Sequence, residues 1–164
     1  MFINLKVHNR AELSAAEQEF LCKIVPLSRQ LQCWTKGKAE FKNIPSPEGI
    51  HASIILGLIL VRSNFGESYL CGVDCNYMSL EHTPRWTGKV TLYKDILYKS
   101  FKDISEFAIN WSDEICFFGE HKDTLRSKDF DFQLRNLSQS PSEYAMIRNI
   151  IDYFGLRDFD YGKN

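Results

Sequence analysis

The sequence predicts an α+β fold in which helices dominate. Apolar residues recur at helical spacing in several segments, a single pair of short β-prone runs lies between them, and helix-capping signatures precede the first and last helical segments. The 164 residues suit one domain, and a hydrophobic content of 44% with 13% aromatics is enough for a core. Helices, then a hairpin, then helices is an order typical of α+β proteins.

The first helix is expected to begin at Ser14. Ser14 and Glu17 have the spacing of a capping box, in which each side chain binds the other residue's backbone N–H. Pro26 predicts a kink inside this helix. Residues 34–50 are polar and contain glycines and prolines, which predicts a loop. The helix should direct four apolar residues to the core: Phe20, Leu21, Ile24 and Leu31.

A second helix is expected over residues 51–64. It is apolar on nearly every side, which predicts a buried central helix. Gly66 should end it or mark a close approach of another segment. Residues 69–88 have no clear periodicity and are expected to be irregular.

A short hairpin should follow. Residues 90–93 and 96–98 are β-prone and are separated only by Lys94 and Asp95, although this turn lacks the usual glycine. A third helix is expected over residues 103–118, with Asp103 as its cap.

The C-terminal part should contain two more helices. The first is short and lies around residues 130–137. The second has Ser140 as its cap, Pro141 in the first turn, Glu143 completing a capping box, and Gly155 as its stop.

Charge and hydropathy exclude several classes of function. Twenty basic and 21 acidic residues give a net charge of -1, which argues against nucleic acid as the main partner and against a polybasic membrane anchor. The most apolar run, residues 54–61, is far shorter than the ~20 residues of a membrane span. Residues 1–6 lack the features of a signal peptide. We therefore expect a protein that is cytoplasmic as synthesised, with non-classical export or association with a virion or injection machine left open.

The cysteines predict reduced, mostly buried thiols. Their number is odd and they form no tight pairing motif. Cys71, Cys75 and His82 are conceivable metal ligands, but their spacing matches no usual zinc pattern and a second ligand pair is missing. We expect no metal site and no other cofactor. The five cysteines are Cys22, Cys33, Cys71, Cys75 and Cys116.

The central helix resembles a motif of bacterial cell-wall glucosaminidases. Residues 51–68 read His-Ala-Ser-Ile-Ile-Leu-Gly-Leu-Ile-Leu-Val-Arg-Ser-Asn-Phe-Gly-Glu-Ser. They are similar to the stretch Pro-Ser-x-x-x-Ala-x-x-x-Leu-Glu-Ser-x-x-Gly-x-Ser of glycoside hydrolase family seventy-three. Ser63, Gly66 and Ser68 fit this pattern, and Phe65 replaces a common tryptophan.

Later segments follow the same family in order. Residues 75–79 partly match its Asn-Asn-aromatic-Phe-Gly segment, and residues 86–90 match its Trp-x-Gly-Lys step into a strand. Residues 97–101 resemble its aromatic-rich run, and residues 140–160 resemble its closing helix and tail. The resemblance covers residues 18–161 and implies a lysozyme-like domain preceded by an N-terminal extension, residues 1–17.

The resemblance places the catalytic glutamate of these enzymes at Arg62. Glycoside hydrolysis needs a carboxylic acid that protonates the leaving oxygen, and a guanidinium holds its proton too tightly for this. An active enzyme would need a substitute acid, for which Glu67 and Asp95 are weak candidates. Glu67 is rotated away from the Arg62 face, and Asp95 lies in the hairpin turn, near the second carboxylate of the family.

Two other acids, Glu81 and Asp74, are weaker candidates. Arg62 itself has two interpretations: it pairs with a cleft carboxylate such as Asp95, or it binds an anionic group of a ligand or partner. The segments that form the family's cleft suggest four glycan-binding residues, because sugar faces stack on aromatic rings; the aromatic ones could equally complete a core. These residues are Asn76, Tyr77, Trp86 and Tyr93.

Three functions remain open at this stage. The first is an inactive lysozyme-like module that binds cell-wall glycan or serves in assembly, as in phage tails or contractile injection systems, by analogy of fold alone. The second is an active peptidoglycan hydrolase with a relocated acid. The third is an interaction or immunity protein, which predicts an exposed apolar patch away from the cleft.

Overall fold

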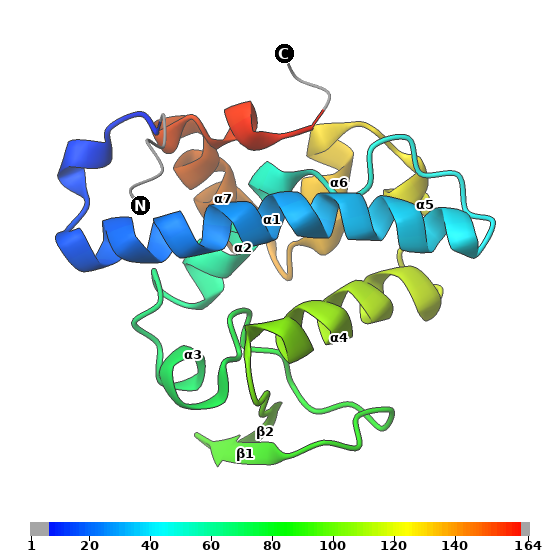
Figure 1. Ribbon diagram of the computed structural model, residues 1–164, viewed down its shortest axis with the longest axis horizontal. Helices are drawn as coiled ribbons and strands as arrows, with labels where there is room; N and C mark the ends of the chain where they lie inside the picture. Colours follow the sequence, from blue (N-terminus) through cyan, green and yellow to red (C-terminus); the bar gives the residue numbers. More distant parts are fainter. Residues whose placement is uncertain (1–6, 162–164) are drawn as a thin grey trace.

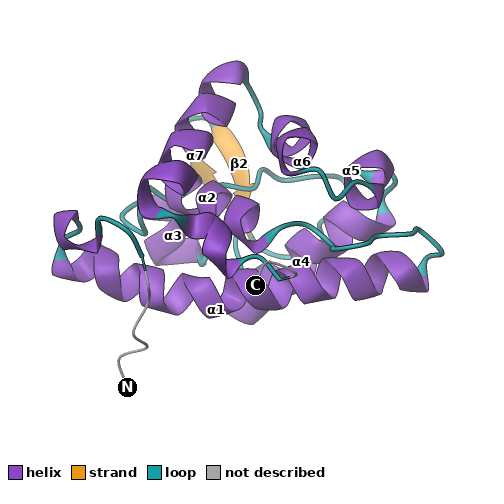
Figure 2. Ribbon diagram, turned by 90° about the horizontal axis from the view of Figure 1, so that it is seen from above, coloured by secondary structure: helices purple, strands orange, loops and turns teal. Residues whose placement is uncertain are grey.

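The computed structural model describes residues 7–161 and consists of helices with one hairpin. Figure 1 shows the arrangement, with the hairpin and α3 on one side of α2 and with α6 and α7 on the other. The hairpin is the one sheet among these residues (Figure 2). The elements are η1 (Arg10–Glu12), α1 (Ala15–Phe41), α2 (Ala52–Arg62), α3 (Tyr69–Asp74), β1 (Val90–Tyr93), β2 (Ile96–Lys99), α4 (Ile104–Phe117), α5 (Lys122–Arg126), α6 (Phe130–Leu137), α7 (Pro141–Phe154) and η2 (Leu156–Phe159).

The central helix is α2, as predicted. Its residues 52–60 are all buried, and it packs against α1, α6, α7 and η2. A Cβ atom on Gly57 would lie 2.6 Å from Cγ2 of Ile147, so the missing side chain lets α7 approach closely. Removing this apolar surface from water is the main driving force for the arrangement.

The first helix is longer than the sequence predicts. Its capping box between Ser14 and Glu17 is present, and the chain remains helical as far as Phe41. The predicted loop over residues 34–50 is therefore wrong in its first half. Thr35 and Ala39 are buried, and packing of α1 on α2 and α4 overrides the weak helical preference of this stretch.

Two short helices, α3 and α5, are also absent from the prediction. The segment 69–88, expected to be irregular, begins with α3, whose cap Ser68 accepts a hydrogen bond from the backbone N–H of Cys71. Helices of five or six residues carry too few turns for a periodic signal, and tertiary contacts stabilise them.

The hairpin is confirmed. Lys94 and Asp95 have φ values of 50° and 65°, so both adopt the left-handed conformation that a tight two-residue turn requires without a glycine. Buried Asp74 holds the hairpin on α3, because its Oδ1 accepts hydrogen bonds from Thr91 and Ser100.

The last helix begins and ends as predicted, at Ser140 and at Gly155, whose φ is 63°. One detail is wrong. The Glu143 carboxylate does not complete a capping box with the Ser140 N–H; it accepts from the Gln139 N–H and from Arg62. Gly66 marks a close approach, because a Cβ there would lie 2.6 Å from the Phe20 ring.

The predicted α+β fold class, in which helices dominate, is confirmed. All five cysteines are free; Cys71 and Cys116 are buried and Cys33 is exposed. Within residues 7–161, no helix is long and apolar enough to cross a bilayer. The division into residues 1–17 and 18–161 stays a prediction, and the expected lack of a signal peptide concerns residues 1–6, outside the described part.

Candidate functional site

A cavity of about 440 Å³ lies beside the C-terminal end of α2. Its wall comes from α2, from the segment between α3 and the hairpin, from β2 and from α4. The wall is completed by His121 just before α5 and by the C-terminal end of α6. The cavity therefore occupies the place where the resemblance puts the catalytic cleft. The lining residues are Leu58, Arg62, Ser79, Leu80, Glu81, Thr83, Lys99, Trp111, Glu114, Ile115, His121, Leu137 and Gln139.

Arg62 is the last residue of α2 and its side chain is only 11% exposed. Its Nη2 donates to Oε1 of Glu143 at 2.8 Å, and its Nε donates to Oε2 at 3.3 Å. The same Nη2 donates to the carbonyl oxygen of Leu137 at 3.1 Å. This two-point contact links the end of α2 to the end of α6 and to the first turn of α7.

The carboxylate of Glu143 is held in its charged form. Burial by itself would raise the pKa of Glu143, but the hydrogen bond and the positive charge of Arg62, helped by the backbone N–H of Gln139, outweigh it. The pKa therefore lies below its ordinary value of 4.5. An acid that is ionised so readily has no proton to give to a leaving group near neutral pH.

The expectation that Arg62 pairs with Asp95 is wrong. Asp95 is exposed in the hairpin turn and does not line the cavity. The fold instead brings α7 to the end of α2, where Glu143 forms the ion pair with the Arg62 guanidinium. The sequence predicts only a helix-capping role for Glu143. Its position as an acid in the first turn of a helix is the one sequence feature that could have indicated the ion pair with Arg62. Glu67 is exposed just after α2 and also lies outside the cavity lining.

Two carboxylates do face the cavity. Glu114 of α4 accepts from Nη2 of Arg85 at 2.9 Å and lies 3.5 Å from Nζ of Lys99. Glu81 is exposed and lies opposite Tyr98 in an antiparallel bridge next to β2. Asp74, the other acid considered, is buried beneath the hairpin and is absent from the cavity lining.

The cavity also has basic groups. Lys99 is 2% exposed and its Nζ donates to Oδ1 of Asn110 at 2.9 Å. Burial lowers the pKa of Lys99, although Glu114 acts in the opposite direction. Burial likewise lowers the pKa of His121, against the influence of Glu120.

Two of the predicted glycan-binding residues lie in the interior. Asn76 is fully buried and bonds the carbonyl oxygens of Leu80 and Lys99 through its side-chain amide. Tyr77 is 4% exposed, and its ring lies 5.3 Å from that of Phe107. A ring enclosed in this way cannot stack on a sugar while the core stays closed.

The other two are more accessible. Trp86 is half-buried, its Nε1 donates to the carbonyl oxygen of Lys89 at 2.8 Å, and its ring packs edge-on against Phe101. Tyr93 is half-buried and stacks on Tyr69 at a centroid distance of 5.0 Å. Neither residue lines the cavity. Their contact with glycan stays a prediction.

No set of three or more His, Cys, Asp or Glu side chains among residues 7–161 is arranged to hold a metal ion. Burial raises the pKa of Cys71 to about 11, so this thiol is protonated at neutral pH. A protonated thiol is a poor metal ligand.

The sequence matches no family model and no curated protein. Solved structures do share the fold, and they confirm the predicted lysozyme-like fold class. The catalytic domain of the autolysin Auto from Listeria monocytogenes is similar with a TM-score of 0.62 and 14% identity, over 92% of both chains. A peptidoglycan hydrolase from Sphingomonas sp. A1 is similar with a TM-score of 0.56 and 14% identity, over 82% of this chain and 92% of the hydrolase.

Proposed function

We propose that this domain is a lysozyme-like scaffold that does not hydrolyse glycan and that binds peptidoglycan at the cavity beside Arg62. The observation that carries the proposal is the Arg62–Glu143 pair. The pair puts a permanent cation at the position where the resemblance implies the catalytic acid, and it holds the nearby Glu143 carboxylate as the counter-ion. Losing general acid help typically lowers a rate by about 10²–10⁴.

The cavity supports the binding part of the proposal. Its volume of about 440 Å³ lies within the range of small-ligand sites. Apolar walls from Leu58 and Trp111 lie beside polar groups such as Thr83, whose hydroxyl has no partner in the described part of the chain. Two proteins of the same fold are an autolysin and a peptidoglycan hydrolase, which favours peptidoglycan as the ligand.

The first experiment measures hydrolysis and binding together. Wild-type protein is mixed with purified peptidoglycan, and turbidity, new reducing ends and co-sedimentation are recorded. We expect saturable co-sedimentation with no loss of turbidity. A Gln139→Trp variant, which fills the exposed rim of the cavity, should sediment at least tenfold less, while Asn149→Trp on the exposed face of α7 should behave as wild type.

Clearing of peptidoglycan by the wild type would contradict the loss of hydrolysis. Sedimentation that Gln139→Trp leaves unchanged would contradict binding at the cavity. The double variant R62E/E143Q provides a second check, because it places an acid at the end of α2 and removes the charge that would repel it. Partial hydrolysis by this variant alone would support the assignment of position 62.

One alternative function has a specific observation behind it: Glu81 and Glu114 face the cavity. An active hydrolase would use one of them as its acid. Glu114 is already engaged by Arg85 and Lys99, which leaves Glu81 as the better candidate. Wild-type hydrolysis that is abolished by Glu81→Gln and retained by Asp95→Asn would establish this alternative.

A further inference from the structure

The outer edge of β1 has unpaired backbone groups. In the hairpin, Tyr93 lies opposite Ile96, directly next to the two-residue turn. The pair that closes such a turn is hydrogen-bonded, and hydrogen-bonded and non-bonded pairs alternate along the strands. The backbone N–H and C=O groups of Tyr93 therefore point to β2, whereas those of Val90 and Leu92 point away from it.

The two edges of the hairpin differ in what covers them. At the outer edge of β2, the N–H of His82 donates to the carbonyl oxygen of Leu97 at 2.9 Å, so the segment before the hairpin covers this edge. At the outer edge of β1, no residue between 7 and 161 forms a hydrogen bond with the backbone of Val90 or Leu92. An edge with free N–H and C=O groups is a template for one more strand.

The side chains at this edge are apolar and exposed. Leu92 is 67% exposed, more than any other large aliphatic side chain in the described part of the chain. Val90 is 43% exposed, and Leu97, directly across the hairpin from Leu92, is 46% exposed. Figure 1 shows the hairpin at one end of the molecule, away from α1 and α7, so another chain can reach β1. Exposed apolar side chains beside free backbone groups indicate an interaction surface.

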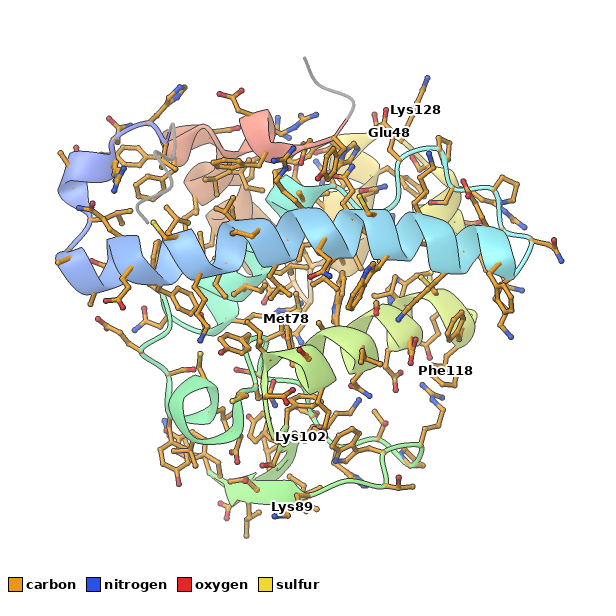
Figure 3. The ribbon with its side chains drawn as sticks, viewed as in Figure 1. Glu48, Met78, Lys89, Lys102, Phe118 and Lys128 are labelled. Atoms are coloured by element: carbon orange, nitrogen blue, oxygen red, sulfur yellow. The ribbon has the colours of Figure 1, made fainter. Side chains whose placement is uncertain are left out.

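The charges along this strand complement those of a second copy. Lys89 precedes Leu92 by three positions and Asp95 follows it by three. If two β1 strands pair antiparallel with Leu92 opposite Leu92, Lys89 of each copy lies opposite Asp95 of the other. Both side chains are exposed, and neither forms an ion pair within residues 7–161; Figure 3 shows Lys89 beside β1. Two unlike pairs, one on either side of the central leucines, favour a second copy over an unrelated strand.

We propose that two copies of this chain associate through β1, in an antiparallel pair centred on Leu92 that joins their hairpins into one sheet. The backbone groups of Leu92 bond with those of Leu92 in the other copy, and Lys89 of each copy pairs with Asp95 of the other. A twofold axis relates the copies, so both use the same surface and the assembly closes as a dimer. The inference is independent of the proposed function, because no residue of β1 lines the Arg62 cavity.

Sedimentation velocity of the whole protein over a range of concentrations tests for the dimer. We expect the wild type to shift reversibly from monomer to dimer as the concentration rises. Leu92→Lys brings two cations together at the twofold axis and should weaken the dimer at least tenfold. Met146→Lys is the matched control, because Met146 is also exposed but lies on α7, and it should dimerise as the wild type does.

Two charge variants test the register of the pair. Lys89→Asp leaves acids opposite acids, and Asp95→Lys leaves lysines opposite lysines, so each variant alone should dimerise at least tenfold more weakly than the wild type. In an equal mixture of the two variants, every acid of one copy lies opposite a lysine of the other, and the dimer should return. A pair centred on Leu92 predicts this rescue, whereas a shifted register does not. Circular dichroism establishes that every variant is folded.

Other results would overturn the proposal. A wild type that stays monomeric at millimolar concentration would exclude the pairing, and a dimer that Leu92→Lys leaves unchanged would place the contact elsewhere. A mixture of the charge variants that stays monomeric would exclude the register. A labelled peptide of alternating valine and threonine that binds a monomeric wild type, and not Leu92→Lys, would assign the edge to a strand of another protein. Binding of a monomeric wild type to phosphatidylglycerol vesicles, lost in Leu92→Lys, would assign it to a membrane surface.

Discussion

The two ends of α2 carry opposite charges, and each is held by a residue from a distant part of the chain. At the N-terminal end, the Asp160 carboxylate accepts from the backbone N–H of Ser53 at 2.7 Å and from its hydroxyl at 2.9 Å. At the C-terminal end, the Arg62 guanidinium is paired with Glu143. An anion at a helix N-terminus and a cation at its C-terminus both stabilise the helix through its dipole.

A catalytic acid at position 62 would destabilise the C-terminal end of α2. A glutamate there would put a negative charge at the negative end of α2 and beside a second carboxylate, Glu143. Both effects raise the pKa of an acid, which favours proton donation and lowers stability. Arg62 instead puts a positive charge at the negative end of α2 and beside the Glu143 carboxylate, and both interactions are favourable. The charges at both ends of α2 therefore stabilise the helix, whereas a glutamate at position 62 would destabilise its C-terminal end.

The largest expected effect is at the N-terminal end. Asp160→Ala removes a side chain that is fully buried and leaves the Ser53 N–H without its acceptor and Arg157 without its counter-ion. We expect a loss of about 3–5 kcal/mol in the free energy of unfolding. Urea denaturation measures it. A loss under 1 kcal/mol would show that this end of α2 tolerates an unpaired group.

At the C-terminal end, Glu143→Gln should cost less, about 1–3 kcal/mol, because the pair is slightly exposed and a glutamine oxygen can still accept from Arg62. Arg62→Met and the double variant R62M/E143Q complete a cycle. We expect the double variant to be more stable than the sum of the single losses predicts, by about 0.5–3 kcal/mol. Strict additivity would mean that the two charges do not interact.

Low pH should reduce the stability that the Arg62–Glu143 pair contributes at the C-terminal end of α2. The folded-state pKa of Glu143 is lowered below 4.5 by Arg62, so this pair contributes stability above that pH and loses it as the pH falls through the folded pKa. Below about pH 4.5, unfolding free energy should therefore fall more steeply for the wild type than for Glu143→Gln. Parallel curves for the two proteins between pH 6 and pH 2.5 would contradict the assignment.

The smallest effect is expected at the hairpin, remote from both ends of α2. Asp95→Asn should change stability by less than about 0.5 kcal/mol, because Asp95 is exposed and asparagine tolerates its left-handed backbone equally well. Thermal unfolding of the variant provides the measurement. A large loss would mean that Asp95 has a partner the turn geometry does not suggest.

By itself, the sequence determined where most helices begin and end. The capping residues bind backbone groups within one turn, so the local sequence is enough to predict them. They are Ser14, Asp103, Ser140 and Gly155. The same holds for the apolar α2 and for the turn at Lys94 and Asp95. The arginine at position 62, from which the proposed loss of hydrolysis is argued, could also be read directly from the sequence.

Only the tertiary structure decided what Arg62 binds. Glu143 lies 81 positions further along the chain, and no local pattern distinguishes it from an ordinary capping glutamate. Likewise, packing decided that Tyr77 is enclosed and that α1 continues to Phe41. Hydrogen bonds within a turn depend on adjacent residues, whereas burial and ion pairs depend on which surfaces meet when the whole chain folds.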